Sequence, residues 1–280
     1  MNPDPDLAVT YSHSLISISD RRDEALHITR HRYDDAATLV PVLISAGDVG
    51  DAAVPALVAD GYEYRLPSES VNGLHVTSSD SACRAAEAVC SVLVTLHNAT
   101  SRLSGSDISR LGPPPWVQRL DKYLTKARVD PTFLSRELRA EIPDRYLSTP
   151  ILPPHQGPAC LLHGAPSLAT TYLAGEQRFV LTTEDVSIGP PELDWAFFLG
   201  ELAELELFDS FTTACYTDAI SEVVEPNLVG LDHSLIDGMV QHRRMLHVLD
   251  YIASFVNVHH QVPQAVFTIL RTIQWESTFR

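Results

Sequence analysis

Lysine is nearly absent from this sequence, although arginine is not. Of 20 basic residues, 18 are arginines, and the two lysines are Lys122 and Lys126. An arginine guanidinium is a planar fork of donors, whereas a lysine ammonium is a compact point charge, so the two do not substitute freely for one another. The first 121 residues therefore cannot supply a lysine ammonium group to a functional site.

Cysteine is also scarce, and its spacing is wide. The four cysteines, at positions 83, 90, 160 and 215, form no C-x-x-C pair. This pattern argues against a structural zinc site and against a disulfide framework in a chain of 280 residues. We expect reduced, buried thiols of the kind found in cytoplasmic proteins.

Long apolar runs and positive charge are missing as well. The apolar run at residues 89–96 is far shorter than the ~18 residues of a membrane-spanning helix, and the N-terminus lacks the basic and apolar regions of a signal peptide. The formal net charge of −16 repels phosphate backbones and anionic lipid. We expect a cytoplasmic protein with no nucleic-acid partner and no membrane partner.

The hydrophobic pattern changes along the chain. Apolar residues alternate with a period of two in the first part of the chain and recur at helical spacing in most of the remainder. The pattern predicts strands at 12–20, 24–33, 61–67, 72–78, 158–164, 170–174 and 178–183, the first two forming a hairpin. It predicts helices at 79–103, 116–128, 131–142, 193–207, 210–224, 234–260 and 263–275.

This distribution of elements predicts an α+β architecture with two lobes. We expect a small β-rich N-lobe over residues 1–80 and a larger, mainly helical C-lobe over residues 81–280. The long helix that begins near Ser81 carries the chain from one lobe to the next. A proline-stiffened linker at 148–157 precedes the strands of the C-lobe.

Residues 161–205 carry a resemblance to a known family. They begin with Leu-Leu-His-Gly, continue through a hairpin, and end in a Gly-Pro-Pro-Glu-Leu-Asp-Trp-Ala segment whose aspartate is Asp194. This order and spacing resembles the core of the aminoglycoside phosphotransferases, a branch of the protein-kinase-like fold. The resemblance implies a kinase-like fold in which residues 161–185 form the catalytic loop region and Asp194 has a structural role.

The positions that would carry the family's chemistry differ. His163 and Gly164 match the motif, but the catalytic aspartate is replaced by Ala165. The family's metal-binding asparagine is replaced by Thr170, and the aspartate that holds the second metal bond is replaced by Thr182. Alanine cannot orient an acceptor hydroxyl, and threonine offers a neutral oxygen where Mg²⁺ prefers an anionic one. The resemblance therefore implies a degenerate member, a pseudokinase.

The N-lobe leads to the same expectation. A kinase-like lobe needs a strand lysine to pair with nucleotide phosphates, but no lysine precedes Lys122. Arg30 is a candidate substitute, although its planar fork is not an ammonium point charge. A glycine-rich phosphate loop is expected between the first two strands, but the first glycine is Gly47. We expect Asp20, Asp23 and Glu24 to lie at that loop and to repel a triphosphate.

Two functions remain open at this point. The first is a binding module that holds a protein partner, a peptide or a small-molecule ligand in the interlobe cleft and transfers no phosphate from ATP. The second is a repurposed enzyme of a natural-product or resistance pathway, in which His163, Glu184 and Asp185 perform metal-independent acid–base chemistry. An atypical phosphotransferase is a distant third. We expect no cofactor and no metal ion.

Overall fold

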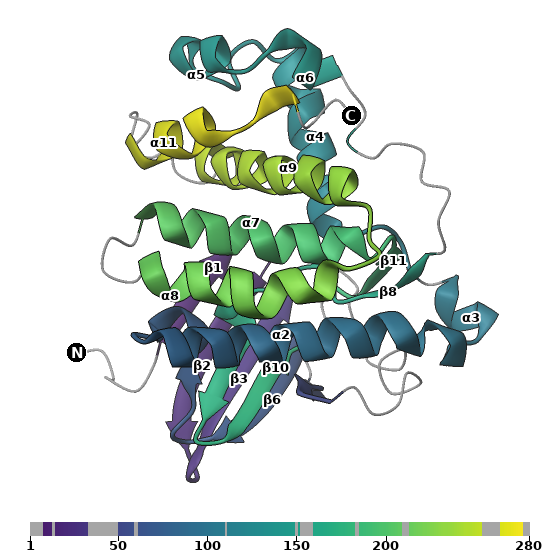
Figure 1. Ribbon diagram of the computed structural model, residues 1–280, viewed down its shortest axis with the longest axis vertical. Coiled ribbons are helices and arrows are strands. Elements are labelled where there is room, and N and C mark those ends of the chain that lie inside the picture. The colour runs from purple at the N-terminus through teal and green to yellow at the C-terminus, as the bar shows by residue number, and fades with distance from the viewer. Residues whose placement is uncertain are drawn as a thin grey trace.

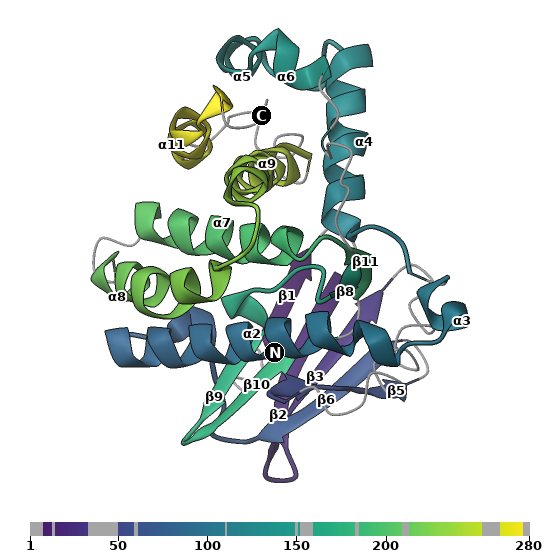
Figure 2. The same ribbon diagram turned by 45° about the vertical axis from the view of Figure 1, so that its right-hand side comes forward.

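The computed structural model describes residues 8–12, 15–32, 50–58, 61–109, 111–148, 151, 159–182, 185–208, 213–253 and 264–276. Strands gather at one end of the molecule, and the helices near the C-terminus lie at the other (Figures 1 and 2). The long helix α2 (Ser79–Ala99) lies between these two regions. The predicted two-lobed α+β architecture is confirmed.

The first sheet is antiparallel and has five strands. Its order is β1-β2-β3-β6-β5, with β1 at Ala8–Ser12, β2 at Leu15–Arg22, β3 at Ala25–Arg32, β6 at Gly61–Pro67 and β5 at Ala56–Val58. The predicted hairpin is β2–β3, which turns at Asp23 and Glu24. Strand β1 was not predicted. Because it precedes β2, the first connection of the sheet lies between Ser12 and Leu15.

The second sheet joins segments from both halves of the chain. Its order is β4-β10-β9-β7, with β4 at Ala52–Ala53, β10 at Gln177–Leu181, β9 at Thr171–Ala174 and β7 at Val71–Asn72. Strand β4 pairs with β10 in parallel, and β7 pairs with β9 in antiparallel orientation. A separate two-stranded sheet pairs β8 (Cys160–Leu162) with β11 (Ser187–Gly189). Backbone pairing therefore ties the N-terminal strands to the C-terminal half.

The helices follow the predicted pattern with shifted ends. Ser78 caps α2 by accepting a hydrogen bond from the Ser81 amide. The other helices among the described residues are α3 (Gly105–Ile108), α4 (Pro115–Val129), α5 (Arg136–Glu141), α6 (Asp144–Ser148), α7 (Glu192–Phe208), α8 (Thr213–Asp218), α9 (His233–Tyr251) and α11 (Gln264–Thr272). Short 3₁₀ segments are η2 (Gly73–His75), η3 (Thr100–Arg102), η4 (Leu168–Thr170) and η6 (Glu225–Leu228), and a π-helical segment, η5, covers Ala219–Val224.

Two predictions of local structure were wrong, and side-chain hydrogen bonds explain both. The strand predicted at 72–78 stops at Asn72, whose side chain accepts a hydrogen bond from the Leu74 amide and so caps a 3₁₀ turn. The helix predicted at 131–142 begins only at Arg136, after the Ser135 cap, and the Asp130 side chain accepts a hydrogen bond from the Thr132 amide. The predicted linker 148–157 and the end of the predicted helix 234–260 lie largely outside the described residues.

Two groups of buried hydrophobic side chains stabilise the described structure. The large core cluster is built mainly from α2, α4, α7, α9 and α11. The small core cluster lies between the two larger sheets, and its buried members are Leu26, Ile28, Tyr62, Tyr64, Leu66 and Leu181. Among the described helices, none has the length and apolarity to cross a bilayer.

Candidate functional site

The loop between β8 and β9, residues 163–170, is held by a buried carboxylate from α7. The backbone amides of His163 and Gly164 donate to the two oxygens of Asp194 over 2.8 and 2.9 Å. His97 Nε2, at the end of α2, lies 3.1 Å from Asp194 Oδ2. Asp194 is fully buried, so these partners replace the water that a buried carboxylate loses. The structural role that the resemblance implied for Asp194 matches these contacts.

Gly164 brings the 163–170 loop into direct contact with a second segment. Its φ is +90°, a conformation that favours glycine. A Cβ atom added at Gly164 would lie 1.6 Å from the backbone oxygen of Asp185. The backbone of Asp185 therefore packs against the loop only because position 164 has no side chain.

A second carboxylate of α7 holds the far end of the same loop. Glu201 accepts hydrogen bonds from the Ser167 hydroxyl at 2.5 Å and from the Leu168 amide at 2.7 Å. Burial raises the pKa of Glu201, and the hydrogen bond from Ser167 opposes that rise. Because Asp194 and Glu201 are seven residues apart, they lie on one face of α7, two turns from each other. Glu201 was not predicted from the sequence, although two acids at this spacing in an apolar helix are a usable signal.

The three degenerate positions present no anionic oxygen. Ala165 is half-buried against the large core cluster. The Thr170 hydroxyl donates to the Ser167 carbonyl at 2.9 Å, and the Thr182 hydroxyl donates to the Val180 carbonyl at 3.0 Å. Thr182 is also fully buried. Across the described residues, no three His, Cys, Asp or Glu side chains come together in a way that could hold a metal ion.

The structure describes two of the three predicted site residues. His163 is 4% exposed, and its Nε2 lies 3.1 Å from the Leu181 carbonyl, so its ring contacts the end of β10. Asp185 is half-buried and follows the Gly164 contact described above. Glu184 lies outside the described residues. The contact between Gly164 and the Asp185 backbone brings His163 and Asp185, two of the three predicted residues, into one region.

The N-lobe side of the site has a cation and a phenol. Burial raises the pKa of Tyr172 in β9, while a hydrogen bond with Asn72 and the charge of Arg30 oppose that rise. Arg30 on β3 is therefore close enough to Tyr172 to interact electrostatically across the two sheets. Asn72 also donates to the Ala169 carbonyl at 2.8 Å, which joins β7 to the 163–170 loop.

The expected position of the N-lobe acids needs correction. Because β1 precedes β2, the first connection of the sheet runs between Ser12 and Leu15, which pair in register. Asp23 and Glu24 lie at the second connection, between β2 and β3, and Asp20 belongs to β2. These acids therefore do not occupy the first connection, where we had expected them. The absence of any glycine before Gly47 is unaffected.

Comparisons with known proteins identify the fold. No family model and no curated protein matches the sequence, but solved structures match over nearly the whole chain. An amicoumacin kinase in complex with AMP-PNP and Ca²⁺ is 12% identical, with a TM-score of 0.63, over 99% of this chain and 89% of that one. A spectinomycin phosphotransferase bound to ADP and spectinomycin is 10% identical, with a TM-score of 0.59, over 98% and 92%.

A choline/ethanolamine kinase family protein from Mesorhizobium loti is 14% identical, with a TM-score of 0.57, over 99% of this chain and 88% of that one. At these identities the likeness shows the fold alone. The chain has the two-lobed, protein-kinase-like fold of the aminoglycoside phosphotransferases, as the sequence resemblance predicted.

Proposed function

We propose that this protein is a catalytically degenerate phosphotransferase-fold module that binds a ligand between its lobes and does not transfer phosphate from ATP. The small-molecule ligands named with the structural neighbours, amicoumacin and spectinomycin, favour a small metabolite over a protein or peptide as that ligand. A cytoplasmic location and a natural-product or resistance context belong to the same proposal.

The observation that carries the proposal is the chemistry of the three degenerate positions. Phosphoryl transfer depends on carboxylates that hold Mg²⁺ against the phosphates and on a group that orients the acceptor hydroxyl. Ala165 has no polar atom in its side chain. Thr170 and Thr182 direct their hydroxyls to carbonyls of their own segments. None of these three residues can therefore orient an acceptor hydroxyl or hold Mg²⁺, which are the roles that their positions have in the family.

The loop itself is well supported despite these losses. Asp194 and Glu201 satisfy four polar groups of the 163–170 loop, namely three backbone amides and one hydroxyl. A loop held in this way keeps its shape without any contribution from a metal ion or a nucleotide. Retention of the framework together with loss of reactive groups supports binding rather than catalysis.

The experiment is a thermal-unfolding titration of the full chain with ATP and GTP, each with and without Mg²⁺. A nucleotide at 100 times its dissociation constant stabilises a folded protein by ~2.7 kcal/mol, so a binder gives an obvious increase in unfolding temperature. We expect no Mg²⁺-dependent increase. A Mg²⁺-dependent shift that is lost in Asp185→Asn would show that an acid outside the expected positions holds the metal, and would overturn the proposal.

The repurposed-enzyme alternative is favoured by one observation, the approach of Asp185 to the 163–170 loop. His163 contributes less to it, because its buried ring contacts a backbone carbonyl, as a bracing residue does. In a strain that lacks the native gene, complementation by Asp185→Asn, Glu184→Gln and His163→Ala at wild-type level would support the binding module. Loss of pathway turnover in the first two variants, with ligand binding retained, would support the enzyme.

A further inference from the structure

One arginine of α9 occupies the face of α7 that meets α9. The two helices lie side by side (Figures 1 and 2), and this face of α7 carries, at helical spacing, Phe197, Gly200, Glu201 and Glu204. The guanidinium carbon of Arg243 lies 4.8 Å from the centre of the Phe197 ring. A Cβ atom added at Gly200 would lie 2.7 Å from Arg243 Cγ. The Arg243 side chain is therefore closely confined by α7.

Two buried carboxylates of α7 share Arg243. Its Nη1 donates to both oxygens of Glu204, over 3.1 and 2.9 Å. Burial raises the pKa of Glu201, the positive charge of Arg243 opposes that rise, and the negative charge of Glu204 adds to it. One guanidinium thus faces two carboxylates, so a further cation beside Glu204 favours the ionised form of Glu201.

His247 is placed to supply that cation from the surface. It lies one turn beyond Arg243 on α9, and its Nδ1 is 2.7 Å from Glu204 Oε2. Its side chain is 48% exposed, whereas that of Glu204 is 5% exposed. Because an ionised carboxylate only accepts hydrogen bonds, Nδ1 carries a proton, and the other ring nitrogen takes up a second proton from water as the pH falls. We call Glu201, Glu204, Arg243 and His247 the α7–α9 network.

The inner end of the α7–α9 network is the 163–170 loop. Glu201 accepts hydrogen bonds from the Ser167 hydroxyl and the Leu168 amide, whereas the first two amides of the loop are held by Asp194. Hydrogen bonds to an ionised carboxylate are stronger than those to a neutral one. How firmly the far end of the loop is held therefore depends on the charge of Glu201, whereas the near end depends on Asp194.

The other ionisable side chains in this region are mainly arginines, carboxylic acids and tyrosines. On α7, α9 and the described helices packed against them, they include Arg244, Asp250 and Tyr251 on α9, Glu206 on α7, Asp218 on α8, Arg119 on α4 and Arg271 on α11. The ordinary pKa values of these residue types lie outside the range of about pH 5 to 8, in which histidine changes its charge. His242 on α9 faces Tyr146 on α6 instead, and burial lowers its pKa to about 4.

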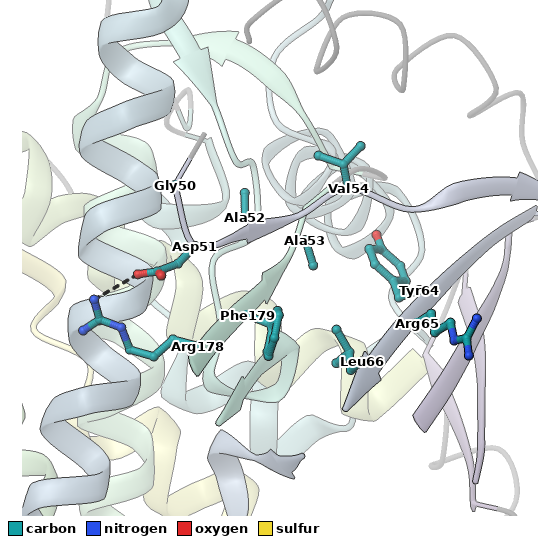
Figure 3. Close-up of a pocket in the computed structure, with 10 residues that line it drawn as sticks. All are labelled: Gly50, Asp51, Ala52, Ala53, Val54, Tyr64, Arg65, Leu66, Arg178 and Phe179. Carbon is teal, nitrogen blue, oxygen red and sulfur yellow. Dashed lines mark ion pairs between the residues drawn. The ribbon is translucent and has the colours of Figure 1, made fainter. Parts of the chain in front are cut away.

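The ion pair between Arg178 and Asp51 provides a comparison. Both side chains line a cavity of about 280 Å³ that lies beside Phe179, between the two larger sheets (Figure 3). They are 29% and 24% exposed, with 3.2 Å between Arg178 Nη2 and Asp51 Oδ2. Arg243 and Glu204 are only 12% and 5% exposed. Water therefore screens their charges less, and a new charge beside them acts more strongly.

We propose that His247 is a pH sensor for the candidate site. When its ring is protonated, the added charge acts on Glu201 through Glu204 and Arg243, and the far end of the 163–170 loop is held more firmly. As the pH rises and the ring loses its proton, that contribution is lost. The effect on the loop stands by itself, whereas control of ligand binding by pH rests on the proposed function.

The first experiment is native-state hydrogen exchange of the full chain at about pH 6 and about pH 8, where a histidine of ordinary pKa is mostly charged and almost wholly neutral, respectively. The wild type is compared with His247→Asn, in which the side-chain amide replaces Nδ1 as a donor to Glu204 and does not titrate. At the lower pH we expect the Leu168 amide to be about threefold better protected in the wild type. At the higher pH we expect equal protection in both. Because each comparison is made at one pH, the titration of Glu201 itself cancels.

The same measurement contains its controls. The two loop amides held by Asp194 should be equally protected in the wild type and in His247→Asn at either pH. His233→Asn changes an exposed histidine on the same helix, and Asp51→Asn removes one carboxylate of the comparison ion pair. Both variants should protect Leu168 as the wild type does.

A second variant tests the route through the network. Glu204→Gln removes the carboxylate that joins His247 to Arg243, so adding His247→Asn to it should leave Leu168 protection unchanged at the lower pH. The unfolding temperature of Glu204→Gln shows whether this buried substitution is tolerated. An effect of His247→Asn that survives in the folded Glu204→Gln protein overturns the proposal.

The comparison of the wild type with His247→Asn is decisive in any case, because His247 is half-exposed and its substitution leaves the core intact. Equal protection of Leu168 in the two proteins at the lower pH, or a difference that persists unchanged at the higher pH, overturns the proposal. A difference shared by the amides held by Asp194 also overturns it, because it reports the stability of the whole loop. No nucleotide or ligand is present, so failure here is distinct from failure of the proposed function in the thermal-unfolding titration.

Discussion

At the residue scale, Gly164 has the least room for a side chain among the described glycines. A side chain there would collide with the Asp185 backbone, whereas a Cβ atom at Gly175, which also has positive φ, would meet nothing within 4 Å. We expect Gly164→Ala to cost at least ~3 kcal/mol of unfolding free energy, and Gly175→Ala only ~1 kcal/mol from backbone strain. Urea unfolding of both variants measures the difference, and equal losses would contradict the Asp185 contact.

We expect His242 to make the stability of the protein depend on pH. It is buried, the Tyr146 hydroxyl lies 2.8 Å from its Nδ1, and burial lowers its pKa to about 4. The unfolded chain binds a proton at His242 near pH 6.5, whereas the folded chain does so only near pH 4. Unfolding therefore takes up a proton between these values, and stability falls as the pH is lowered from about 6.5 to about 4, by about 3 kcal/mol from this group.

The measurement is the unfolding free energy at several pH values between 4 and 7. His242→Gln removes the titrating group, so its stability should fall less steeply with decreasing pH than that of the wild type. His75→Gln changes an exposed histidine and serves as the control, with a wild-type slope. Parallel curves for the wild type and His242→Gln would show that the buried ring does not resist protonation.

At the element scale, the β2–β3 hairpin turns through two residues that are unusual for such a turn. Asp23 and Glu24 have φ values of 50° and 58°, the left-handed conformation that two-residue hairpin turns require and that glycine adopts without strain. We expect Glu24→Gly to stabilise the protein by about 1 kcal/mol. Chemical unfolding measures the change.

The control for that variant is the same substitution where the backbone is not left-handed. Glu69 is exposed in a turn and has no positive φ. Glu69→Gly should therefore be destabilising, because glycine gains freedom in the unfolded chain without relieving strain in the folded one. Destabilisation by both substitutions would show that the β2–β3 turn is unstrained.

Elements with long, regular patterns were predictable from the sequence, and those governed by local side-chain bonds were not. The β2–β3 hairpin, β6, α2, α4 and α7 all lie within a few residues of their predicted positions. The Asn72 cap ends the strand β7, and the Ser135 cap moves the start of the helix α5 to Arg136, because each side chain accepts a hydrogen bond from a nearby amide. Strand β1 was missed because five residues carry too short an alternation to be distinguished from a loop.

For the candidate site, the sequence predicted identities but not contacts. The assignment of Ala165, Thr170 and Thr182 to the catalytic and metal positions comes from the spacing of the resemblance, and it stays a prediction. The contact of Glu201 with Ser167 and the cavity beside Phe179 depend on the packing of segments far apart in the sequence. No local pattern contains that information.

At the scale of the whole molecule, the two core clusters differ greatly in size. Among the side chains that the structure describes, the small core cluster has six buried members, whereas the large core cluster extends through most of the helices. Local opening requires less free energy where fewer apolar contacts break. We expect amides of β3 and β6 to exchange hydrogen faster than amides of α2 and α7, as measured by native-state exchange.

A variant separates cluster size from other causes of fast exchange. Tyr64 is buried in the small core cluster, and Leu96 is buried in the large one. Tyr64→Ala should accelerate exchange in β3 and β6 with little change in α7, whereas Leu96→Ala should accelerate exchange in α2 and α7. Uniform acceleration throughout the chain in both variants would show that the two clusters open as a single cooperative unit.

Asp194, on helix α7, holds the backbone amides of His163 and Gly164, the two residues before position 165, and the side chain at 165 takes no part in those hydrogen bonds. Foldability and reactivity are therefore encoded at separate positions of this chain. A protein engineer who introduces an acid, a thiol or a metal-binding group at 165 begins with a finished scaffold whose backbone needs no redesign.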